Sequence, residues 1–291
     1  MSEKHLTKTR FDSFPFSQAI LDGVRDAGFE YCTPIQAQTL PMALDGQDLA
    51  GQAQTGTGKT AAFLLAIFHL LDQEPAELSR RANQPRSLIL APTRELAVQI
   101  YNDACVLAGH TGLKVRVVYG GTGYDTQRKA LEDGVDILIG TPGRIIDYFK
   151  QHVFDLRAIQ ILVLDEADRM FDMGFIKDIR FLLRRCPEPQ DRQGMLFSAT
   201  LAYRVIELAY EHMNNPQKVV VEAEQITADK VRETAYMVAN DEKISLLIGL
   251  MRGLEQARAI VFINTKREAD RVLGFLRSEE HTSELQSRQV I

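Results

Sequence analysis

A stretch near the amino terminus combines glycine, lysine and threonine in the pattern of a phosphate-binding loop. It lies between a strand-like segment, residues 48–52, and an apolar helical pattern. Glycines let backbone N–H groups turn toward phosphate oxygens, while Lys59 would reach the β- and γ-phosphates and the Thr60 hydroxyl would bind Mg²⁺. The general pattern has glycine at the position of Ala53, and the alternative is an ordinary glycine-rich turn. The predicted loop comprises Ala53, Gln54, Thr55, Gly56, Thr57, Gly58, Lys59 and Thr60.

Two acidic residues follow an apolar segment, residues 161–164, where a buried strand would end. Asp165 would hold Mg²⁺ through its water shell, and Glu166 would orient and deprotonate an attacking water. The alternative is a helix start, where the helix dipole favours acidic side chains. Since a phosphate loop and a metal carboxylate require each other, the pair favours hydrolysis of ATP with Mg²⁺.

The composition narrows the classes of protein to which this chain can belong. Its 291 residues are 45% hydrophobic and 25% charged, which argues against a disordered, collagen-like or disulfide-scaffold chain. The formal net charge of −5 provides no global attraction to nucleic acid or acidic membranes, so a polyanion needs a local site. Three widely spaced cysteines, a polar start and no apolar stretch long enough to cross a bilayer indicate a cytoplasmic protein without membrane contact.

Short segments rich in β-branched residues alternate with helical patterns along most of the chain. Continuous apolar runs suit a sheet covered on both faces, and the alternation predicts a parallel, doubly wound α/β domain up to about Glu222. The predicted strands are Ser87–Ala91, Val115–Tyr119, Asp136–Gly140, Ile159–Leu164, Met195–Ser198 and Lys218–Glu222. The predicted helices are Arg94–Ala108, Gly143–Lys150, Asp172–Arg184 and Ala202–Tyr210.

A second, shorter pattern follows a polar segment, residues 223–232, that is typical of a linker. From Arg277 the apolar pattern ends, and two βα units are too few to close a hydrophobic core. An incomplete second domain is therefore expected. Its predicted elements are strands at Thr234–Val238 and Ala259–Ile263 and helices at Glu242–Met251 and Arg267–Leu276.

The two motifs together resemble the DEAD-box family of ATP-dependent RNA helicases, whose name is spelled here by Asp165, Glu166, Ala167 and Asp168. The resemblance implies a RecA-like P-loop domain, with ATP and Mg²⁺ as cofactors. It also implies RNA-stimulated ATP hydrolysis and non-processive unwinding of short RNA duplexes. The residues to which it assigns catalytic roles are Lys59, Asp165, Glu166 and Asp168.

Residues 28–36 are similar to the family's adenine-sensing Q motif, and Phe11 lies 17 residues before Gly28, where the family has an isolated aromatic residue. The resemblance implies that Gln36 pairs with adenine N6 and N7, because a carboxamide offers both a donor and an acceptor. It also implies that Phe11 stacks on the base. The alternative for Phe11 is that it anchors an N-terminal arm.

Three strand-to-helix junctions carry free backbone N–H groups, a hydroxyl and often an arginine, which together suit phosphate. In the family these motifs grip the RNA backbone, and 2′-OH contacts favour RNA over DNA. The alternative is that each is only a good helix start, such as the N-cap and proline at Thr141 and Pro142. The implied RNA-binding residues are Pro92, Thr93, Arg94, Gly120, Gly121, Thr141, Pro142, Gly143 and Arg144.

Ser198, Ala199 and Thr200 match the family's SAT motif, which couples the acidic motif to the RNA-bound state. Their hydroxyls would hydrogen-bond Asp168 at the end of a neighbouring strand. The alternative is that Thr200 caps the next helix. Val261–Thr265 resembles the first motif of the family's second domain.

Segments such as GQAQTGTGKTAAFL and VDILIGTPGRIIDY are most similar to a bacterial subgroup that acts with ribonuclease E in RNA turnover, within the RNA degradosome. Two alternatives are an ATPase acting on DNA or protein and, for this chain, an ATP- and RNA-binding module without unwinding activity. The second alternative follows because the family's late RNA-binding and arginine-rich motifs have no counterpart here.

The resemblance implies five parts along the chain. An N-terminal arm with the Q motif, 1–36, precedes the RecA-like domain, 37–222, and the linker, 223–232. A partial second RecA-like domain, 233–276, is followed by a tail, 277–291, that is similar to a translated sequencing adapter. We therefore expect that the tail is not native sequence.

Overall fold

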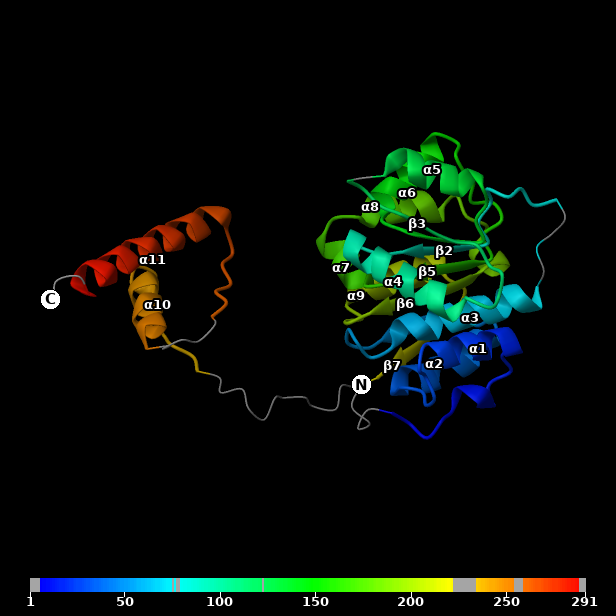
Figure 1. Cartoon of the computed structure of the whole chain (residues 1–291), viewed down its shortest axis with the longest axis horizontal. Coiled ribbons are helices and arrows are strands. Elements are labelled where there is room, and N and C mark those ends of the chain that lie inside the picture. Colours follow the sequence, from blue (N-terminus) through cyan, green and yellow to red (C-terminus); the bar gives the residue numbers. More distant parts are fainter. Residues whose placement is uncertain are drawn as a thin grey trace. The chain divides into compact units, whose positions relative to one another are not determined.

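The computed structural model describes residues 6–74, 76, 79–121, 123–221, 234–253 and 259–287, and only the backbone of 278–287. Its contacts divide the chain into two units, Met1–Gln225 and Ile226–Ile291 (Figure 1). The predicted linker lies outside the described residues.

A seven-stranded sheet forms the middle of the first unit, in the order β3-β4-β2-β5-β6-β1-β7. Every pairing is parallel, so that Leu49 of β1 lies beside Met195 of β6 on one side and Gln217 of β7 on the other. The predicted parallel α/β architecture is confirmed. The strands are β1 (Leu49–Gln52), β2 (Ser87–Leu90), β3 (Val115–Val118), β4 (Ile137–Gly140), β5 (Ile161–Leu164), β6 (Gln193–Ser198) and β7 (Gln217–Val220).

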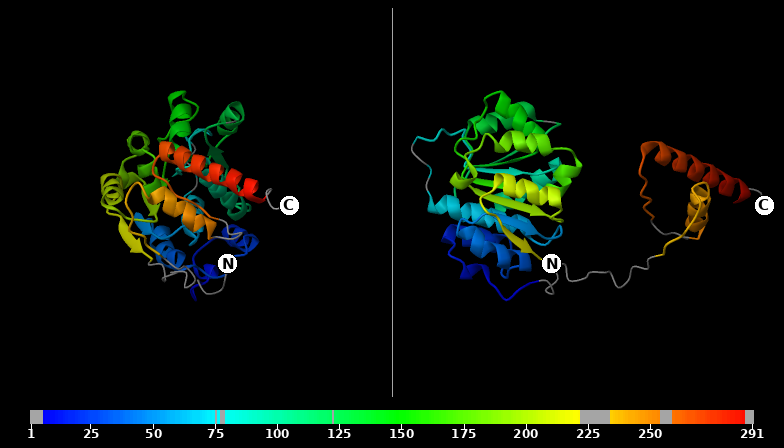
Figure 2. Two further views of the ribbon diagram at one scale, coloured as in Figure 1. Left: turned by 90° about the vertical axis from the view of Figure 1, so that its left-hand side faces the viewer. Right: turned by 180° about the vertical axis from the view of Figure 1, so that it is seen from behind.

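Each face of the sheet has its own hydrophobic core, because successive residues of a strand point to opposite faces. Ile89 and Val163 contribute to the core under helices α1 to α4, while Leu88 and Leu164 contribute to the core under α6 to α9. Figure 2 shows the sheet with helices covering it. The apolar runs are continuous because both faces of these strands are buried.

Nine α-helices belong to the described part of the first unit, with short 3₁₀ turns at Phe11–Ser13 (η2) and Pro189–Asp191 (η3). The α-helices are α1 (Gln18–Asp26), α2 (Pro34–Leu44), α3 (Lys59–Gln73), α4 (Arg94–Leu107), α5 (Tyr124–Glu132), α6 (Pro142–Lys150), α7 (Ala167–Asp172), α8 (Ile176–Leu183) and α9 (Tyr203–His212).

The single helix predicted over Asp172–Arg184 is wrong at its start. Helix α7 ends at Asp172 and α8 begins at Ile176, with Gly174 between them at φ +80°. This left-handed conformation cannot continue a right-handed helix, and glycine adopts it without a Cβ clash. The apolar spacing continues across the break, which is why the sequence pattern did not reveal it.

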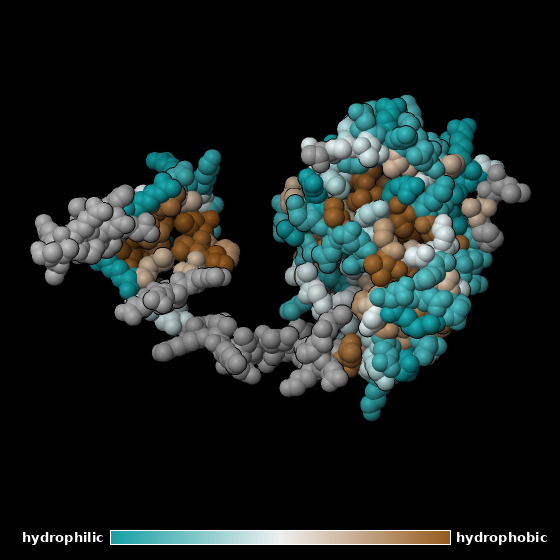
Figure 3. Space-filling view, in the orientation of Figure 1, coloured by the Kyte–Doolittle hydropathy of each residue, from teal (hydrophilic) through white to brown (hydrophobic). Residues whose placement is uncertain are grey.

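The described part of the second unit contains helices α10 (Lys243–Arg252) and α11 (Lys266–Ser287). The strands predicted at Thr234–Val238 and Ala259–Ile263 are wrong, because neither segment has strand pairing. A strand needs neighbours to satisfy its backbone groups. Phe262 is 92% exposed, and apolar side chains gather on the visible face of this unit (Figure 3).

Two general features concern the membrane and the thiols. Within the described ranges, no helix combines the length and apolar character needed to cross a membrane. Cys32, Cys105 and Cys186 all carry free thiols.

Candidate functional site

The carboxyl ends of parallel strands meet at one edge of the sheet, and each predicted motif of the α/β domain follows one of these ends. The phosphate loop follows β1, the Ser198–Thr200 segment ends β6, and Asp165 follows β5, so these three motifs are neighbours. The predicted RNA motifs follow β2, β4 and β3, which continue the sheet in that order. We call β1, β6 and β5 the nucleotide half of the edge, and β2, β4 and β3 the RNA half.

The phosphate loop turns from β1 into α3 through two glycines in left-handed backbone conformations, Gly56 at φ +82° and Gly58 at φ +92°. Lys59 is the first residue of α3 and is 6% exposed, and its Nζ donates to the carbonyl of Ala53 at 2.7 Å. The lysine therefore spans the mouth of its own loop. Thr60 follows it in the first turn of the helix, as the phosphate-loop pattern predicts.

Gln36 connects the Q motif to the phosphate loop. Its Oε1 accepts from the Thr33 backbone N–H at 2.8 Å, and its Nε2 donates to the Gly58 carbonyl at 3.0 Å. A Cβ on Gly58 would lie 2.4 Å from this Nε2. A carboxamide has two lone pairs and two N–H donors, so one of each is left for a base.

Phe11 is 2% exposed and its ring centroid lies 6.1 Å from that of Phe29. Its backbone N–H donates to the Glu30 carbonyl at 3.2 Å, which fixes the N-terminal arm against the Q motif. The anchoring alternative therefore describes Phe11 in this structure. A cavity of about 530 Å³ touches Phe11, but its lining contains neither Gln36 nor the phosphate loop.

Asp165 is a buried carboxylate, 2% exposed, at the end of β5. Burial raises the pKa of its carboxyl to about 6; Glu166 and Asp168 add to this effect, and Lys59 opposes it. Its Oδ1 accepts from the backbone N–H of Glu166 at 2.9 Å. Desolvation disfavours the charged form of the carboxyl, whereas a bound cation would favour that form and lower the pKa again.

A magnesium ion fits these residues. Among the described side chains, no three His, Cys, Asp or Glu residues are placed to hold a metal ion. Magnesium at a phosphate site needs no such group, since it is commonly held by one or two carboxylates, water and substrate phosphates. Asp165 and the Thr60 hydroxyl supply oxygen ligands of this kind.

Glu166 has an unusual backbone, with φ +50° and ψ +51° at the N-cap of α7. A left-handed conformation costs a non-glycine residue roughly 1–2 kcal/mol, and such residues cluster at functional sites. Its Oε2 accepts from Arg169 Nη1 at 3.0 Å, a contact that the sequence analysis missed. The i,i+3 spacing of Glu166 and Arg169 on one helix was the available signal.

Asp168 joins β5 to β6. Its Oδ2 accepts from both the backbone N–H and the hydroxyl of Thr200, each at 3.0 Å, and its backbone N–H donates to Ser198 Oγ at 3.2 Å. Burial alone would raise the pKa of Asp168, but hydrogen bonds with Ser198 and Thr200 lower it below its ordinary value. The alternative that Thr200 caps the next helix is wrong, since the N-cap of α9 is Ala202.

The RNA half contains two helix starts of different kinds. Thr93 caps α4 by accepting from the Leu96 N–H at 3.3 Å, and Pro92 before it is buried. Thr141 precedes Pro142 at the start of α6 as predicted, but its side chain makes no capping hydrogen bond. The hydroxyl at Thr141 is therefore not used by its own helix.

The RNA half combines exposed glycines with two arginines that lie over aromatic rings. Gly120, Gly121 and Gly143 are exposed, and Gly121 has φ +106°. Arg94 lies over the ring of Tyr119, and Arg144 lies over the rings of Tyr124 and Tyr148. Sequence reasoning missed these three tyrosines, although two of them flank the glycines of residues 120–123.

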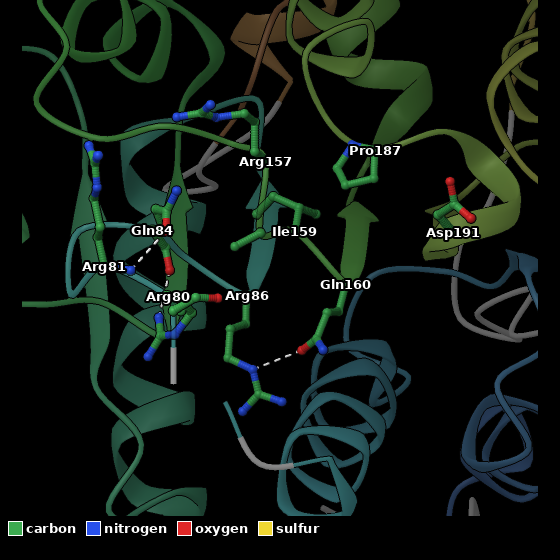
Figure 4. A pocket seen from close by; sticks show the side chains of 11 residues that line it. Arg80, Arg81, Gln84, Arg86, Arg157, Ile159, Gln160, Pro187 and Asp191 are labelled. Atoms are coloured by element: carbon green, nitrogen blue, oxygen red, sulfur yellow. Dashed lines mark hydrogen bonds between the residues drawn. The ribbon is translucent and has the colours of Figure 1, made fainter. Parts of the chain in front are cut away.

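A separate cavity of about 550 Å³ opens at the opposite edge of the sheet, where β2 and β5 begin. Four arginines line it, but the guanidinium groups of three of them are already bound within the protein. Arg86 donates to Gln160 Oε1 at 2.8 Å (Figure 4) and also to the Leu71 and Glu74 carbonyls. Arg80 pairs with Asp136 at 2.6 Å, and Arg157 pairs with Asp155 at 3.1 Å. These arginines therefore connect the loops that lead into β2 and β5 to the rest of the domain.

The comparisons with known proteins agree with this arrangement. Residues 33–209, more than half of the chain, match the family described as DEAD/DEAH box helicase. The chain belongs to this family, and the predicted resemblance is confirmed.

Among individual relatives, an ATP-dependent RNA helicase RhlB of Vibrio campbellii is 56% identical over 97% of this chain, and one of Xanthomonas oryzae is 59% identical over 94%. The chain spans 64% and 48% of the lengths of these two relatives. A crystal structure of a DEAD box protein from Methanococcus jannaschii matches 92% of this chain and 70% of its own, with 32% identity and a TM-score of 0.67.

Proposed function

We propose that this chain is part of an ATP-dependent RNA helicase whose ATP hydrolysis is stimulated by RNA. The observation that carries the proposal is the strand order, which places the phosphate loop, the Ser198–Thr200 segment and Asp165 side by side and the three predicted RNA motifs next to them at the same edge. Family membership and the relatives named as ATP-dependent RNA helicases support it. The full helicase is expected to be longer than this chain, since the relatives are.

In the nucleotide half, the backbone N–H groups of residues 54–59 cradle the phosphates, and Lys59 moves from the Ala53 carbonyl to the β- and γ-phosphates. Gln36 and Phe11 contact the adenine, which requires the buried Phe11 ring to become accessible. Asp165, through the water shell of the ion, and the Thr60 hydroxyl would hold Mg²⁺. Bound Mg²⁺ supplies positive charge to the phosphoryl oxygens as negative charge develops there.

Glu166 is the general base in this proposal, because it is the second carboxylate at the end of β5. The hydrogen bond from Arg169 fixes the direction of its carboxylate. Its left-handed backbone turns the residue out of the strand direction before α7 begins. Glu166 would accept the proton of the attacking water as the γ-phosphoryl group is transferred.

Asp168 is the residue through which RNA and ATP influence each other. Its carboxylate belongs to the segment that carries Asp165 and Glu166, and Thr200 and Ser198 bind it from β6. A movement of the Ser198–Thr200 segment on RNA binding therefore changes the position of the catalytic carboxylates.

In the RNA half, free N–H groups, the Thr141 hydroxyl and the two arginines contact the sugar–phosphate backbone. Such contacts are independent of sequence, and 2′-OH contacts select RNA over DNA. We also propose that the full-length protein unwinds short duplexes without processivity, works with ribonuclease E in the RNA degradosome, and acts in the cytoplasm.

The test is ATP turnover of the full-length helicase with single-stranded RNA, with single-stranded DNA of the same sequence, and without polymer. We expect strong stimulation by RNA alone. Equal stimulation by DNA would exclude RNA selectivity, and equal turnover without polymer would exclude coupling. For the 291 residues alone, we expect weak binding of Mg-ATP and RNA without unwinding. The reason is that the arginines of the family's second domain have no counterpart here. Arginines of this kind raise the rate of phosphoryl transfer by about 10³–10⁵.

A further inference from the structure

The segment that carries Gly120 and Gly121 begins and ends with a tyrosine, Tyr119 and Tyr124. Each tyrosine lies against an arginine from a different predicted RNA motif. The guanidinium carbon of Arg94, on α4, is 4.6 Å from the Tyr119 ring centroid, and that of Arg144, on α6, is 4.8 Å from the Tyr124 centroid. One loop thus contacts both arginines of the RNA half.

Two hydrogen bonds with the Gln127 side chain fix the backbone of Tyr119. Its N–H donates to Gln127 Oε1 at 3.0 Å, and its carbonyl accepts from Gln127 Nε2 at 3.3 Å. On the other side, a Cβ built on Gly121 would lie 3.6 Å from Arg94 Nη1, which is ordinary van der Waals contact. The guanidinium of Arg94 therefore lies beside both the tyrosine ring and the glycine backbone that is predicted to bind phosphate.

Arg144 lies against two rings. Its guanidinium carbon is also 5.4 Å from the Tyr148 centroid, and the Tyr124 and Tyr148 centroids are 4.8 Å apart. The Tyr148 hydroxyl donates to the Tyr124 carbonyl at 2.7 Å and accepts from Arg144 Nη1 at 3.4 Å. Since Tyr148 is buried in the core beneath α6, Arg144 is fixed to the domain through Tyr124 and Tyr148.

An aromatic ring holds an arginine differently from a carboxylate. A carboxylate neutralises the cation and occupies its N–H donors, whereas a ring attracts the charge through its face and leaves the donors for another acceptor. Among the described residues, no carboxylate lies within ion-pair distance of Arg94, and the only one near Arg144 is Asp147 at 3.9 Å. Both arginines are thus held in place while most of their donors stay open to an anion.

We propose that Tyr119 and Tyr124 are positioning residues, which hold Arg94 and Arg144 in their phosphate-binding geometry before RNA arrives. One loop would then set the spacing of two arginine contacts and of the glycine N–H groups between them. The inference rests on the proposed function, because it takes the RNA backbone as the ligand of this half. Fixing both side chains in advance reduces the entropy lost when RNA binds.

The test is a crossed set of double mutants, with affinity for fluorescently labelled single-stranded RNA measured by anisotropy at one fixed salt concentration. Tyr119→Leu and Tyr124→Leu should each weaken binding about 2- to 5-fold, the range for exposed cation–π pairs. Tyr119→Phe and Tyr124→Phe keep the rings and should bind like the unchanged chain. Tyr210→Leu, which removes an exposed tyrosine of α9, is the matched control.

Combining each tyrosine variant with each arginine variant separates a positioning role from a general loss of structure. Tyr119→Leu should have no further effect when Arg94 is already alanine, but its full effect when Arg144 is alanine. Tyr124→Leu should show the reverse. A destabilised loop would instead weaken binding equally in both backgrounds, and that result would overturn the inference.

Two further outcomes are distinguishable. If the unchanged chain bound no RNA, the proposed function would fail and the inference with it. If the unchanged chain bound RNA and the two leucine variants bound it equally well, the proposed function would stand and the positioning role would be wrong. Circular dichroism of each variant checks that the fold is intact.

Discussion

Asp165→Asn should make the ligand-free protein more stable with rising pH, relative to the unchanged chain, and in the full-length helicase it should abolish ATP hydrolysis. Burial raises the pKa of Asp165 from its ordinary value of 3.8 to about 6. The native state therefore binds this proton more tightly than the unfolded state does. Stability falls as the pH rises above 3.8, and the loss is complete above about 6.

The size of the effect follows from these two values. A difference of one in pKa corresponds to about 1.4 kcal/mol, so the full loss is about 3 kcal/mol. Between pH 5 and pH 8 the linkage relation leaves about 1.5 kcal/mol of this loss. Asparagine does not titrate, and whatever the burial of its amide costs is the same at each pH. The pH-dependent part therefore isolates the carboxylate.

The assay is urea unfolding followed by circular dichroism, at several pH values between 5 and 8 and with a chelator present. Asp168→Asn is the matched control, because hydrogen bonds lower the pKa of Asp168 and its ionised form stabilises the native state above pH 3.8. That variant should still lose stability from pH 5 to pH 8, and by slightly less than the unchanged chain, because the charge of Asp168 adds to the raised pKa of Asp165. Mg-ATP should stabilise the unchanged chain far more than Asp165→Asn. A stability difference between Asp165→Asn and the unchanged chain that did not vary with pH would refute the reasoning.

Three other outcomes are expected. Gln36→Ala should weaken adenine nucleotides by about 1–3 kcal/mol and leave guanine nucleotides nearly unaffected in competition binding; equal losses for both would mean that Gln36 supports only the loop at Gly58. Glu166→Gln in the full-length helicase should keep ATP and RNA affinity but lower the turnover rate by about 10²–10⁴, and unchanged turnover would remove its role as the base. Thr200→Val should reduce stimulation by RNA more than turnover without RNA, measured as the ratio of the two rates; a proportional loss of both would contradict the coupling role.

The strands of the α/β domain could be predicted from sequence because burial on both faces leaves continuous apolar runs such as Ile161–Leu164. Helix α2 could not be predicted in this way, because it contains Pro41 and lacks a clear apolar face. The break at Gly174 left no mark in the apolar spacing. The predicted strands of the second unit failed because a strand depends on neighbours that local sequence does not specify.

For the candidate site, the sequence could predict that the motifs share one edge, because parallel strands end together. It could not predict which motifs are neighbours, since the strand order is a property of the whole sheet. The contacts of Gln36 with Gly58, of Arg169 with Glu166 and of Tyr119 with Arg94 depend on that order or on local rotamers. The roles given to these residues stay predictions.

The pairing of β1 has a consequence for the timing of protein synthesis. β1 pairs only with β6 and β7, and its flanking residue Asp48 binds the backbone of Gly194, 146 residues later. At roughly 5–20 residues per second, the ribosome needs roughly 7–30 s to make that stretch. Throughout this interval the nascent phosphate loop has no strand beside it, while β2, β3 and β4, all within residues 87–140, can already pair. A nascent chain should therefore assemble its RNA half first and bind nucleotide only after β6 has left the exit tunnel.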